Sequence, residues 1–259
     1  MDLGLKDKVA LITGGTNGIG LATARLLYGE GARVVVCGRD TGRLDTVAAE
    51  FGSDRFAALP GDVTDPAALQ RLHDEATARF GGLDILVNNV GGSSRGPALD
   101  ISDEAWETDL SLKLMAHVRM ARIAVPGMRS RGGGAIVSVL GIVGKHPSAQ
   151  STPTSVSRAA GLAYAKALSR DLAPDNIRVN CVCVGVIKSE QHDRRWRGQQ
   201  DQLSRDEFYD RLAATRGVPM GRTGEAGEAA AAIAFLVSGA ASYITGAALN
   251  VDGGSSHVS

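Results

Sequence analysis

The chain has 259 residues, of which 44% are hydrophobic, so it is long and apolar enough to bury one large core. Its 28 basic residues balance 28 acidic ones, and no net charge therefore attracts nucleic acid or an anionic membrane surface. We expect a single domain over residues 1–259, with a small molecule or further copies of the chain as partners.

The N-terminal residues and the cysteines favour a cytoplasmic protein. Residues 1–8 lead directly into the apolar run Val9–Ile12, without a basic stretch followed by a signal-length apolar segment. No run approaches the length that spans a membrane. The three cysteines lie in apolar, strand-like runs without the spacing of a disulfide framework or a zinc site, so we expect no metal.

Short apolar runs of strand length recur along the chain, with helical segments between them. These runs are Val9–Thr13, Arg33–Cys37, Phe56–Pro60, Ile85–Asn88, Ala135–Val139, Arg178–Val184 and Ala248–Val251. Helices are predicted at Ile19–Gly29 and Thr41–Phe51, and two more begin after the N-cap residues Asp65 and Ser102. Strands that alternate with helices predict a doubly wound α/β fold, whose parallel sheet is covered on both faces.

Residues 190–216 break this alternation with a polar, charge-dense stretch. Arginines alternate there with aspartates and glutamates, and Trp196, Phe208 and Tyr209 lie among them. Two interpretations are open: a solvated surface excursion, or a mobile helical lid over a site at the carboxyl ends of the strands. Because the stretch follows the sixth strand, we favour the lid.

A glycine-rich turn, Thr13–Gly20, follows the first strand and opens a helix. Glycines permit a tight turn and let backbone N–H groups at the helix N-terminus approach a pyrophosphate. The spacing of Gly14, Gly18 and Gly20 differs from the G-x-G-x-x-G pattern, so the turn alone is weak evidence for a dinucleotide.

Five motifs together make the chain resemble the short-chain dehydrogenase/reductase family over nearly its whole length. They are Thr13–Gly20, Gly61–Val63 after the third strand, Asn88–Gly91 after the fourth, Ile177–Asn180 at the sixth, and Gly246–Gly254 near the C-terminus. The resemblance implies a Rossmann-type fold, a nicotinamide dinucleotide cofactor and, in most relatives, a homotetramer.

The resemblance also implies which residues bind the cofactor. Residues matching Asp62 and Val63 flank the adenine in the family, and those matching Asn89 and Gly91 line the floor beneath the ribose and diphosphate. Val184 stands where the family usually has a proline, whereas the positions that meet the nicotinamide carboxamide are kept. The expected cofactor-binding residues are Gly14, Thr16, Asn17, Gly18, Ile19, Gly20, Arg39, Asp62, Val63, Asn89, Val90, Gly91, Arg158, Gly185 and Ile187.

The end of the second strand favours NADP(H) over NAD(H). An acidic side chain at the Gly38 position would bind both ribose hydroxyls and repel a 2′-phosphate, and glycine does neither. Arg39 offers a planar charged group suited to a phosphate, although it could instead be a surface residue paired with Asp40. Asn17 stands where many NADP-using relatives place a second basic residue.

The catalytic positions of the family all differ in this chain. Without gaps, Gly141 aligns with the serine, Thr154 with the tyrosine, Arg158 with the lysine and Lys113 with the asparagine. A threonine hydroxyl is far less acidic than a phenol, and an arginine does not exchange protons near neutrality. Thr154 could still orient a substrate oxygen, and Arg158 could still hold the nicotinamide ribose.

Lys113 is the strongest candidate for proton transfer. A lysine that is partly desolvated near another cation has a lowered pKa and becomes a usable acid or base. The alternative, given similar weight, is that Lys113 pairs with a carboxylate such as Asp109 and is structural. His146, on the loop that borders the substrate pocket in relatives, is a weaker candidate.

Three functions are compatible with these residues. The first is an NADP(H)-dependent oxidoreductase with a rebuilt proton-transfer site, acting on a small carbonyl or alcohol compound. The second is a non-catalytic nucleotide-binding sensor or scaffold, and the third is a lyase or isomerase that keeps the cofactor as a structural element. We favour the oxidoreductase because members of the family are overwhelmingly enzymes.

Overall fold

The computed structural model of the chain describes residues 2–198 and 203–258. A seven-stranded parallel sheet lies at its centre, in the order β3-β2-β1-β4-β6-β8-β9. Its strands are β1 (Val9–Thr13), β2 (Arg33–Gly38), β3 (Phe56–Pro60), β4 (Ile85–Asn88), β6 (Gly134–Gly141), β8 (Ile177–Val184) and β9 (Ala248–Val251). This confirms the doubly wound α/β fold, and the predicted strands are displaced by at most one or two residues.

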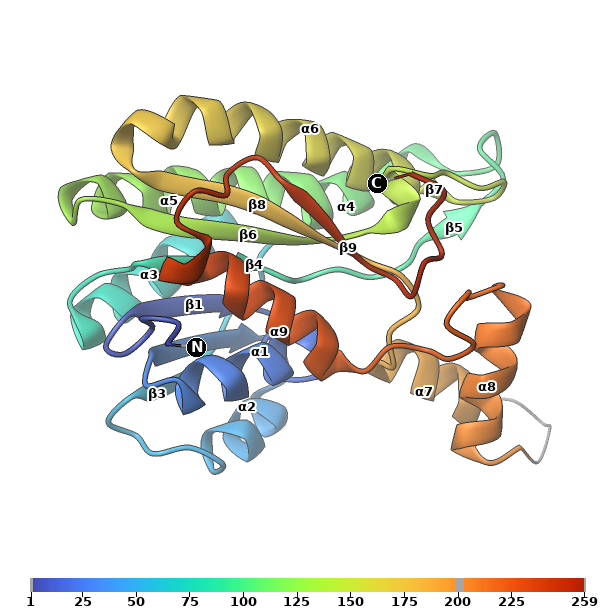
Figure 1. Cartoon of the computed structure of the whole chain (residues 1–259), viewed down its shortest axis with the longest axis horizontal. Helices are drawn as coiled ribbons and strands as arrows, with labels where there is room; N and C mark the ends of the chain where they lie inside the picture. Colours follow the sequence, from blue (N-terminus) through green and yellow to red (C-terminus); the bar gives the residue numbers. More distant parts are fainter. Residues whose placement is uncertain (1, 199–202, 259) are drawn as a thin grey trace.

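Helices cover both faces of the sheet (Figure 1). The side chains of α1 (Gly18–Gly29), α2 (Thr41–Ala48) and α9 (Ala226–Val237) pack into one buried cluster. Those of α3 (Pro66–Phe80), α5 (Ala116–Ser130) and α6 (Thr154–Leu172) pack into a second cluster on the opposite face. Helix α2 ends three residues before the predicted Phe51, whose ring stacks on Phe56 of β3 with centroids 4.0 Å apart.

One long helical region contains a single π-helical turn between two α-helical parts. Helix α4 (Asp103–Leu110) continues through a π-helical turn, η1 (Ser111–Met115), directly into α5. Such turns are rare and occur frequently at functional sites. Lys113 lies in the middle of this turn, which the sequence pattern does not predict.

Two short strands and two helices lie outside the layers. Strand β5 (Arg95–Gly96) pairs antiparallel with β7 (Thr152–Pro153), and α7 (Glu190–Arg197) and α8 (Arg205–Thr215) form a helical pair at one end of the molecule (Figure 1). The predicted segment 190–216 thus contains the two helices α7 and α8, and its residues 199–202 lie outside the described part.

The remaining short elements are the 3₁₀ turns η2 (Ile142–Gly144), η3 (Ala173–Asp175) and η4 (Gly239–Ala241). Within the described residues, no helix is both long enough and apolar enough to cross a membrane.

Candidate active site

A cavity of about 540 Å³ opens at the carboxyl ends of the strands, around the point between β1 and β4 where the strand order reverses. Doubly wound sheets bind ligands at this switch point. The predicted cofactor residues that line the cavity are Gly14, Thr16, Asn17, Gly18, Ile19, Arg39, Asp62, Val63, Asn89, Val90 and Gly91. Four other predicted residues are not part of its wall: Gly20, Arg158, Gly185 and Ile187.

The glycine turn is tied to the loop that follows β4. The side-chain amide of Asn89 donates to the carbonyl oxygens of Thr13 and Gly14, each at 3.1 Å. Gly14 has a φ of +66°, and a β-carbon on Gly20 would overlap with the Gly14 carbonyl oxygen. Both positions therefore require glycine, and Gly20 supports the cavity from behind its wall.

The first turn of α1 is free to bind an anion. Its N-cap residue, Asn17, makes no side-chain capping bond, whereas α2, α3 and α4 are capped by Asp40, Asp65 and Ser102. The uncapped backbone N–H groups and the helix dipole therefore face a ligand in the cavity. Turn, helix and cavity together fit a dinucleotide with its pyrophosphate against α1.

Three arginines line the cavity, and two of them, Arg39 and Arg43, come from the segment after β2. Arg39 is 81% exposed, and its Nη1 lies 3.8 Å from Oδ2 of Asp62. Its predicted alternative partner Asp40 instead pairs with Arg43, at 3.4 Å. Arg43 and Arg194 also line the cavity, and sequence reasoning missed both as candidate cofactor residues.

Arg43 could have been found from its place in the first turn of the helix after β2. Arg194 comes from the distant α7, and only the fold brings it to this cavity. Gly38 packs tightly as well, since a β-carbon there would lie 2.9 Å from Cγ2 of Thr16. An acidic side chain of the kind that favours NAD(H) therefore has no room unless Thr16 moves.

Lys113 lies at the centre of a buried polar network. Its Nζ donates to the carboxylate of Asp109 and, at 2.8 Å, to Oγ1 of Thr154. Ser157 donates to the other Asp109 oxygen at 2.6 Å. The Lys113 and Asp109 side chains are 1% and 3% exposed, so the pairing weighed as an alternative is present and is shielded from solvent.

The hydroxyl of Thr154 is fully engaged in this network. It donates to the carbonyl oxygen of Ser94 at 2.6 Å and accepts from the Ser94 N–H at 3.0 Å, in addition to Lys113. A hydroxyl has one proton and two acceptor sites, and all three are used. Thr154 therefore anchors the segment before β5, and its proton is not directed at a substrate.

Burial lowers the pKa of Lys113. Asp109 opposes this shift through its hydrogen bond and its charge, whereas the positive charges of Arg158 and Arg95 reinforce it. The cause matches the prediction from desolvation and neighbouring cations. The proton on Lys113 is thereby more easily lost than that of a surface lysine.

Arg158 lies behind the cavity floor. Its Nη1 donates to the carbonyl oxygen of Val139 at 2.9 Å, and a β-carbon on Gly91 would overlap with its Nη2. Burial lowers the pKa of Arg158 to about 10, with Asp109 and Cys183 opposing the shift. Arg158 therefore remains a cation at neutral pH and places a fixed positive charge beside the floor residue Gly91.

Two predicted positions do not join this network. Gly141 has no side chain to offer, and a β-carbon there would make only ordinary contacts, with its nearest neighbour, Cγ2 of Val143, at 3.5 Å. His146 is exposed and packs edge-on against His257, with centroids 4.7 Å apart. Neither a serine hydroxyl nor an imidazole therefore completes the Lys113 network.

A second cavity of about 360 Å³ adjoins the first. It is lined by residues 92–94 and one face of α4, and it shares Gly92 and Leu112 with the larger cavity. Asp109 and Lys113 form part of its wall. The buried ion pair thus lies in the wall of the smaller cavity, which adjoins the dinucleotide-sized one.

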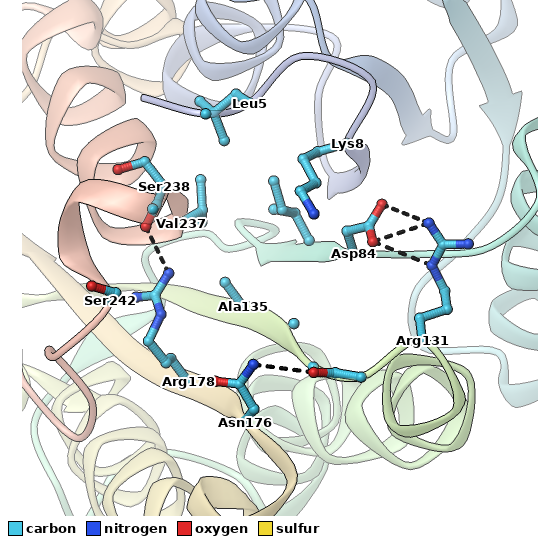
Figure 2. A pocket seen from close by; sticks show the side chains of 16 residues that line it. Leu5, Lys8, Asp84, Arg131, Ala135, Asn176, Arg178, Val237, Ser238 and Ser242 are labelled. Atoms are coloured by element: carbon cyan, nitrogen blue, oxygen red, sulfur yellow. Dashed lines mark hydrogen bonds and ion pairs between the residues drawn. The ribbon is translucent and has the colours of Figure 1, made fainter. Parts of the chain in front are cut away.

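A third cavity, of about 270 Å³, lies at the opposite edge of the sheet, by the amino ends of β1, β4, β6 and β8 (Figure 2). Two of its cations are engaged within the protein. Nη2 of Arg131 donates to both oxygens of the Asp84 carboxylate, each at 3.1 Å. Arg178 donates to the carbonyl oxygens of Leu236 and Ser238. These contacts tie chain segments together, so this cavity is structural.

One buried histidine lies a turn beyond Lys113. His117 is 2% exposed, and neither of its ring nitrogens has a hydrogen-bond partner among the described residues. Burial, followed by the charge of Arg158, lowers the pKa of His117 to about 3.

Over the described residues, no group of three or more His, Cys, Asp or Glu side chains could hold a metal ion.

Comparison with known proteins identifies relatives over the whole chain. Residues 14–256 match the family model described as enoyl-(acyl carrier protein) reductase. The human protein dehydrogenase/reductase SDR family member 4 is 36% identical over 254 residues, which cover 96% of this chain and 88% of that protein.

The chain is also similar to solved structures over nearly its full length. A short-chain oxidoreductase from Pseudomonas aeruginosa PAO1, described as containing an atypical catalytic center, is 33% identical with a TM-score of 0.94 for its apo form. That match covers 99% of this chain and 100% of the other, and the relative was also solved with NADPH bound. L-sorbose reductase from Gluconobacter frateurii, in complex with NADPH and L-sorbose, is 35% identical with a TM-score of 0.93 over the full length of both chains.

Proposed function

The chain belongs to the short-chain dehydrogenase/reductase family, and we propose that it is an NADP(H)-dependent oxidoreductase with a non-standard proton-transfer site. Its substrate in this proposal is a small carbonyl or alcohol compound. The observation that carries the proposal is the buried ion pair of Lys113 and Asp109, which forms part of the wall of the smaller cavity next to the dinucleotide-sized one.

The arginines around the larger cavity support NADP(H) as the cofactor. Arg39, Arg43 and Arg194 would surround the 2′-phosphate, and guanidinium groups bind phosphate through paired hydrogen bonds. The two structural relatives that contain NADPH support the same choice. Glu190, Gln191 and Arg194 of α7 line the cavity, which supports residues 190–216 as a lid over the site.

The bound cofactor would supply or accept the hydride. Lys113 would stabilise negative charge on the substrate oxygen and donate a proton to it, because its ammonium is desolvated and its pKa is lowered. Asp109 and Thr154 would hold the ammonium in place, and Arg158 would keep a positive charge next to the cavity floor. For this step, the residues in the wall of the smaller cavity would move slightly, so that the buried ammonium of Lys113 reaches the substrate oxygen.

The test is to incubate the purified chain with NADPH or NADH and a panel of ketones, aldehydes and sugars, and to follow the absorbance of the reduced cofactor. We expect turnover with NADPH and at least about tenfold weaker binding of NADH, the loss that accompanies one missing charge-assisted contact. Tight NADPH binding without consumption across the whole panel would contradict the proposal.

The burial of Lys113 favours a second candidate, a non-catalytic nucleotide-binding protein. Its ammonium is 1% exposed and already neutralised by Asp109, which also suits a purely structural role. Tight NADPH binding that alters association with another protein, without turnover, would support this function. Substrate conversion without any change in NADPH absorbance would instead indicate a lyase or isomerase.

A further inference from the structure

Ser157 lies at the start of α6, between Thr154 and Arg158, and is fully buried. Its hydroxyl lies 2.6 Å from Oδ2 of Asp109 and 3.1 Å from the carbonyl oxygen of Thr154. A hydroxyl carries one proton, and a carboxylate accepts a stronger hydrogen bond than a neutral carbonyl does. The proton of Ser157 is therefore directed at Asp109.

The two oxygens of the Asp109 carboxylate have different donors. Lys113 donates to Oδ1, and Ser157 donates to Oδ2. All three side chains are buried. Solvent therefore contributes little to the stability of the carboxylate charge, which depends on the two donors. The bond from Ser157 is the one that does not involve the ammonium of Lys113.

Proton transfer changes the two bonds to Asp109 unequally. In the proposed reaction, Lys113 gives a proton to the substrate oxygen and becomes a neutral amine, and it recovers a proton from solvent through the smaller cavity, whose wall it forms. Between these two steps, Asp109 is a buried anion without a cationic partner, which is strongly unfavourable. The hydrogen bond from Ser157 stays in place during this interval, because it does not contain the transferred proton.

We propose that Ser157 is a positioning residue for proton transfer, whose hydroxyl stabilises the Asp109 carboxylate while Lys113 is neutral. This inference rests on the proposed oxidoreductase function. Ser157 is not part of the wall of either cavity, so it acts on the reaction through Asp109. Without this hydroxyl, the anion left by proton transfer is less stable, and Lys113 holds its proton more tightly.

The charged groups around Lys113 are not altered when the serine is replaced. Burial lowers the pKa of Lys113, and Asp109 opposes this shift. The charges of Arg158 in α6 and Arg95 in β5 reinforce it. His117, a turn beyond Lys113, has a pKa of about 3 and is neutral well above that range. A change in the titration of Lys113 therefore reports on the serine hydroxyl.

Two variants remove the hydroxyl, Ser157→Ala and Ser157→Cys. The thiol of Ser157→Cys is a weak donor that fills the space, so this variant gives a second test if Ser157→Ala admits a water molecule or folds poorly. Ser157→Thr restores a hydroxyl at the same position. Ser169→Ala is the matched control, because Ser169 is a buried serine of the same helix that donates to the carbonyl oxygen of Lys166, at 2.7 Å.

The first measurement is the pH dependence of NADPH turnover with a carbonyl compound. A proton donor must be protonated, so activity falls as the pH rises through the pKa of Lys113. In Ser157→Ala and Ser157→Cys this fall should move to higher pH by about one unit, a tenfold change in the ionisation constant that matches the loss of one hydrogen bond to a charged group. At neutral pH, kcat should decrease about 3-fold to 10-fold, because a tightly held proton is transferred more slowly, while KM changes less than about twofold.

The second measurement follows the Lys113 ammonium directly and does not depend on turnover. The full chain is prepared with isotope-labelled lysine and saturated with NADP⁺, and the Nζ signal of Lys113 is followed by NMR as the pH is raised. Lys113→Arg identifies this signal. In Ser157→Ala and Ser157→Cys the titration should move upward by about one pH unit, and in Ser169→Ala it should not move.

A lower kcat and an upward shift of the Lys113 titration in Ser157→Ala and Ser157→Cys, reversed in Ser157→Thr and absent in Ser169→Ala, support the inference. An unchanged titration, an unchanged kcat, or equal effects in Ser169→Ala overturn it. If NADPH is consumed but the titration does not move, the inference fails and the oxidoreductase function stands. If the titration moves but no compound oxidises NADPH, the proposed function fails and Ser157 keeps its influence on the charge of Lys113.

Discussion

At the level of single residues, the four altered catalytic positions fall into two groups. Lys113 and Thr154 contact each other, and each has a further partner, Asp109 for Lys113 and Ser94 for Thr154, so their side chains form one interdependent unit. Arg158 and Gly141 lie outside this unit: Arg158 donates to the carbonyl oxygen of Val139 in β6, and Gly141 has no side chain. The four catalytic positions have therefore not changed independently, because two of the replacement residues, Lys113 and Thr154, are hydrogen-bonded to each other.

Replacing Lys113 tests how strongly this unit supports the fold. Lys113→Met leaves the Asp109 carboxylate buried without its cation, which we expect to lower the free energy of unfolding by about 3–5 kcal/mol. Equilibrium urea unfolding measures the change. The double variant Lys113→Met/Asp109→Asn removes both charges and should recover most of the loss. Equal destabilisation of the single and double variants would show that the charge pair is not the cause.

A buried histidine makes stability depend on pH. The pKa of His117 is about 3 in the folded chain, compared with an ordinary value of 6.5. Below pH 6.5 the unfolded state therefore takes up a proton that the folded state refuses, and stability is lost as the pH falls toward 3. The loss from this group should be about 2 kcal/mol between pH 7 and pH 5.

His117→Leu isolates this contribution, because leucine keeps the volume and removes two unpaired nitrogens. Urea unfolding at pH 7 and pH 5 should show a smaller loss for the variant by about 2 kcal/mol. At pH 7 the variant should be at least as stable as the parent chain, since a buried polar group without a partner is removed. A parallel decrease in both proteins would assign the pH dependence to other groups.

The candidate site shows which residue details the sequence could supply. The glycine turn, Asn89 and Arg39 line one cavity because each follows a strand whose carboxyl end is fixed by the sheet, and their part in cofactor binding stays a prediction. The sequence also predicted the cause of the lowered Lys113 pKa, but it left the pairing with Asp109 open. Whether a lysine reaches a carboxylate or a substrate depends on side-chain directions in a π-helical turn, which have no periodic sequence signal.

At the level of elements, α7 meets α2 beside the cofactor cavity. Arg43, in the first turn of α2, has its Nη2 3.7 Å from Oε1 of Glu190 at the start of α7. Glu190 also lines the cavity and pairs with Arg197. A phosphate that binds Arg43 competes with Glu190 for its guanidinium, so cofactor binding and the position of α7 are coupled in the proposed function.

Substitution of Arg43 should therefore discriminate between the two cofactors. Arg43→Gln removes one charged donor to the 2′-phosphate, so we expect about 10-fold to 100-fold weaker NADPH binding and unchanged NADH binding. Fluorescence titration of each cofactor measures both values. The control is Arg25→Gln, an arginine of α1 that pairs with Glu50 at 2.7 Å. Equal loss for NADPH and NADH would place Arg43 away from the 2′-phosphate.

The elements themselves differ in how far sequence could predict them. All seven strands of the central sheet were predicted because each is a short apolar run bounded by turn residues. The strands β5 and β7 were not, since a two-residue pair held by Thr154 and Ser94 leaves no pattern in the chain. The helical pair α7 and α8 was predicted only as a polar excursion or lid, because its charges hide the few buried positions such as Tyr209.

At the level of the whole molecule, one edge of the sheet remains open in the single chain. Strand β9 is the last strand of the sheet, and its Leu249 is 42% exposed. Tyr243, in the segment before β9, is fully exposed. Exposed apolar side chains on an edge strand favour pairing with another chain. This surface supports the predicted homotetramer, in which β9 would form one of the contacts between subunits.

Replacing an apolar side chain of this edge tests the assembly. Leu249→Asp places a charge in the proposed interface, where a buried unpaired carboxylate is strongly unfavourable, so the tetramer should dissociate to dimers joined through the remaining pairing. Light scattering coupled to size-exclusion chromatography measures the mass of each species. Leu99→Asp is the matched control, because Leu99 is 98% exposed in the loop after β5, away from this edge, and should leave the tetramer intact. A monomeric parent chain would refute the assembly itself, whereas a tetrameric Leu249→Asp variant would move the interface away from β9.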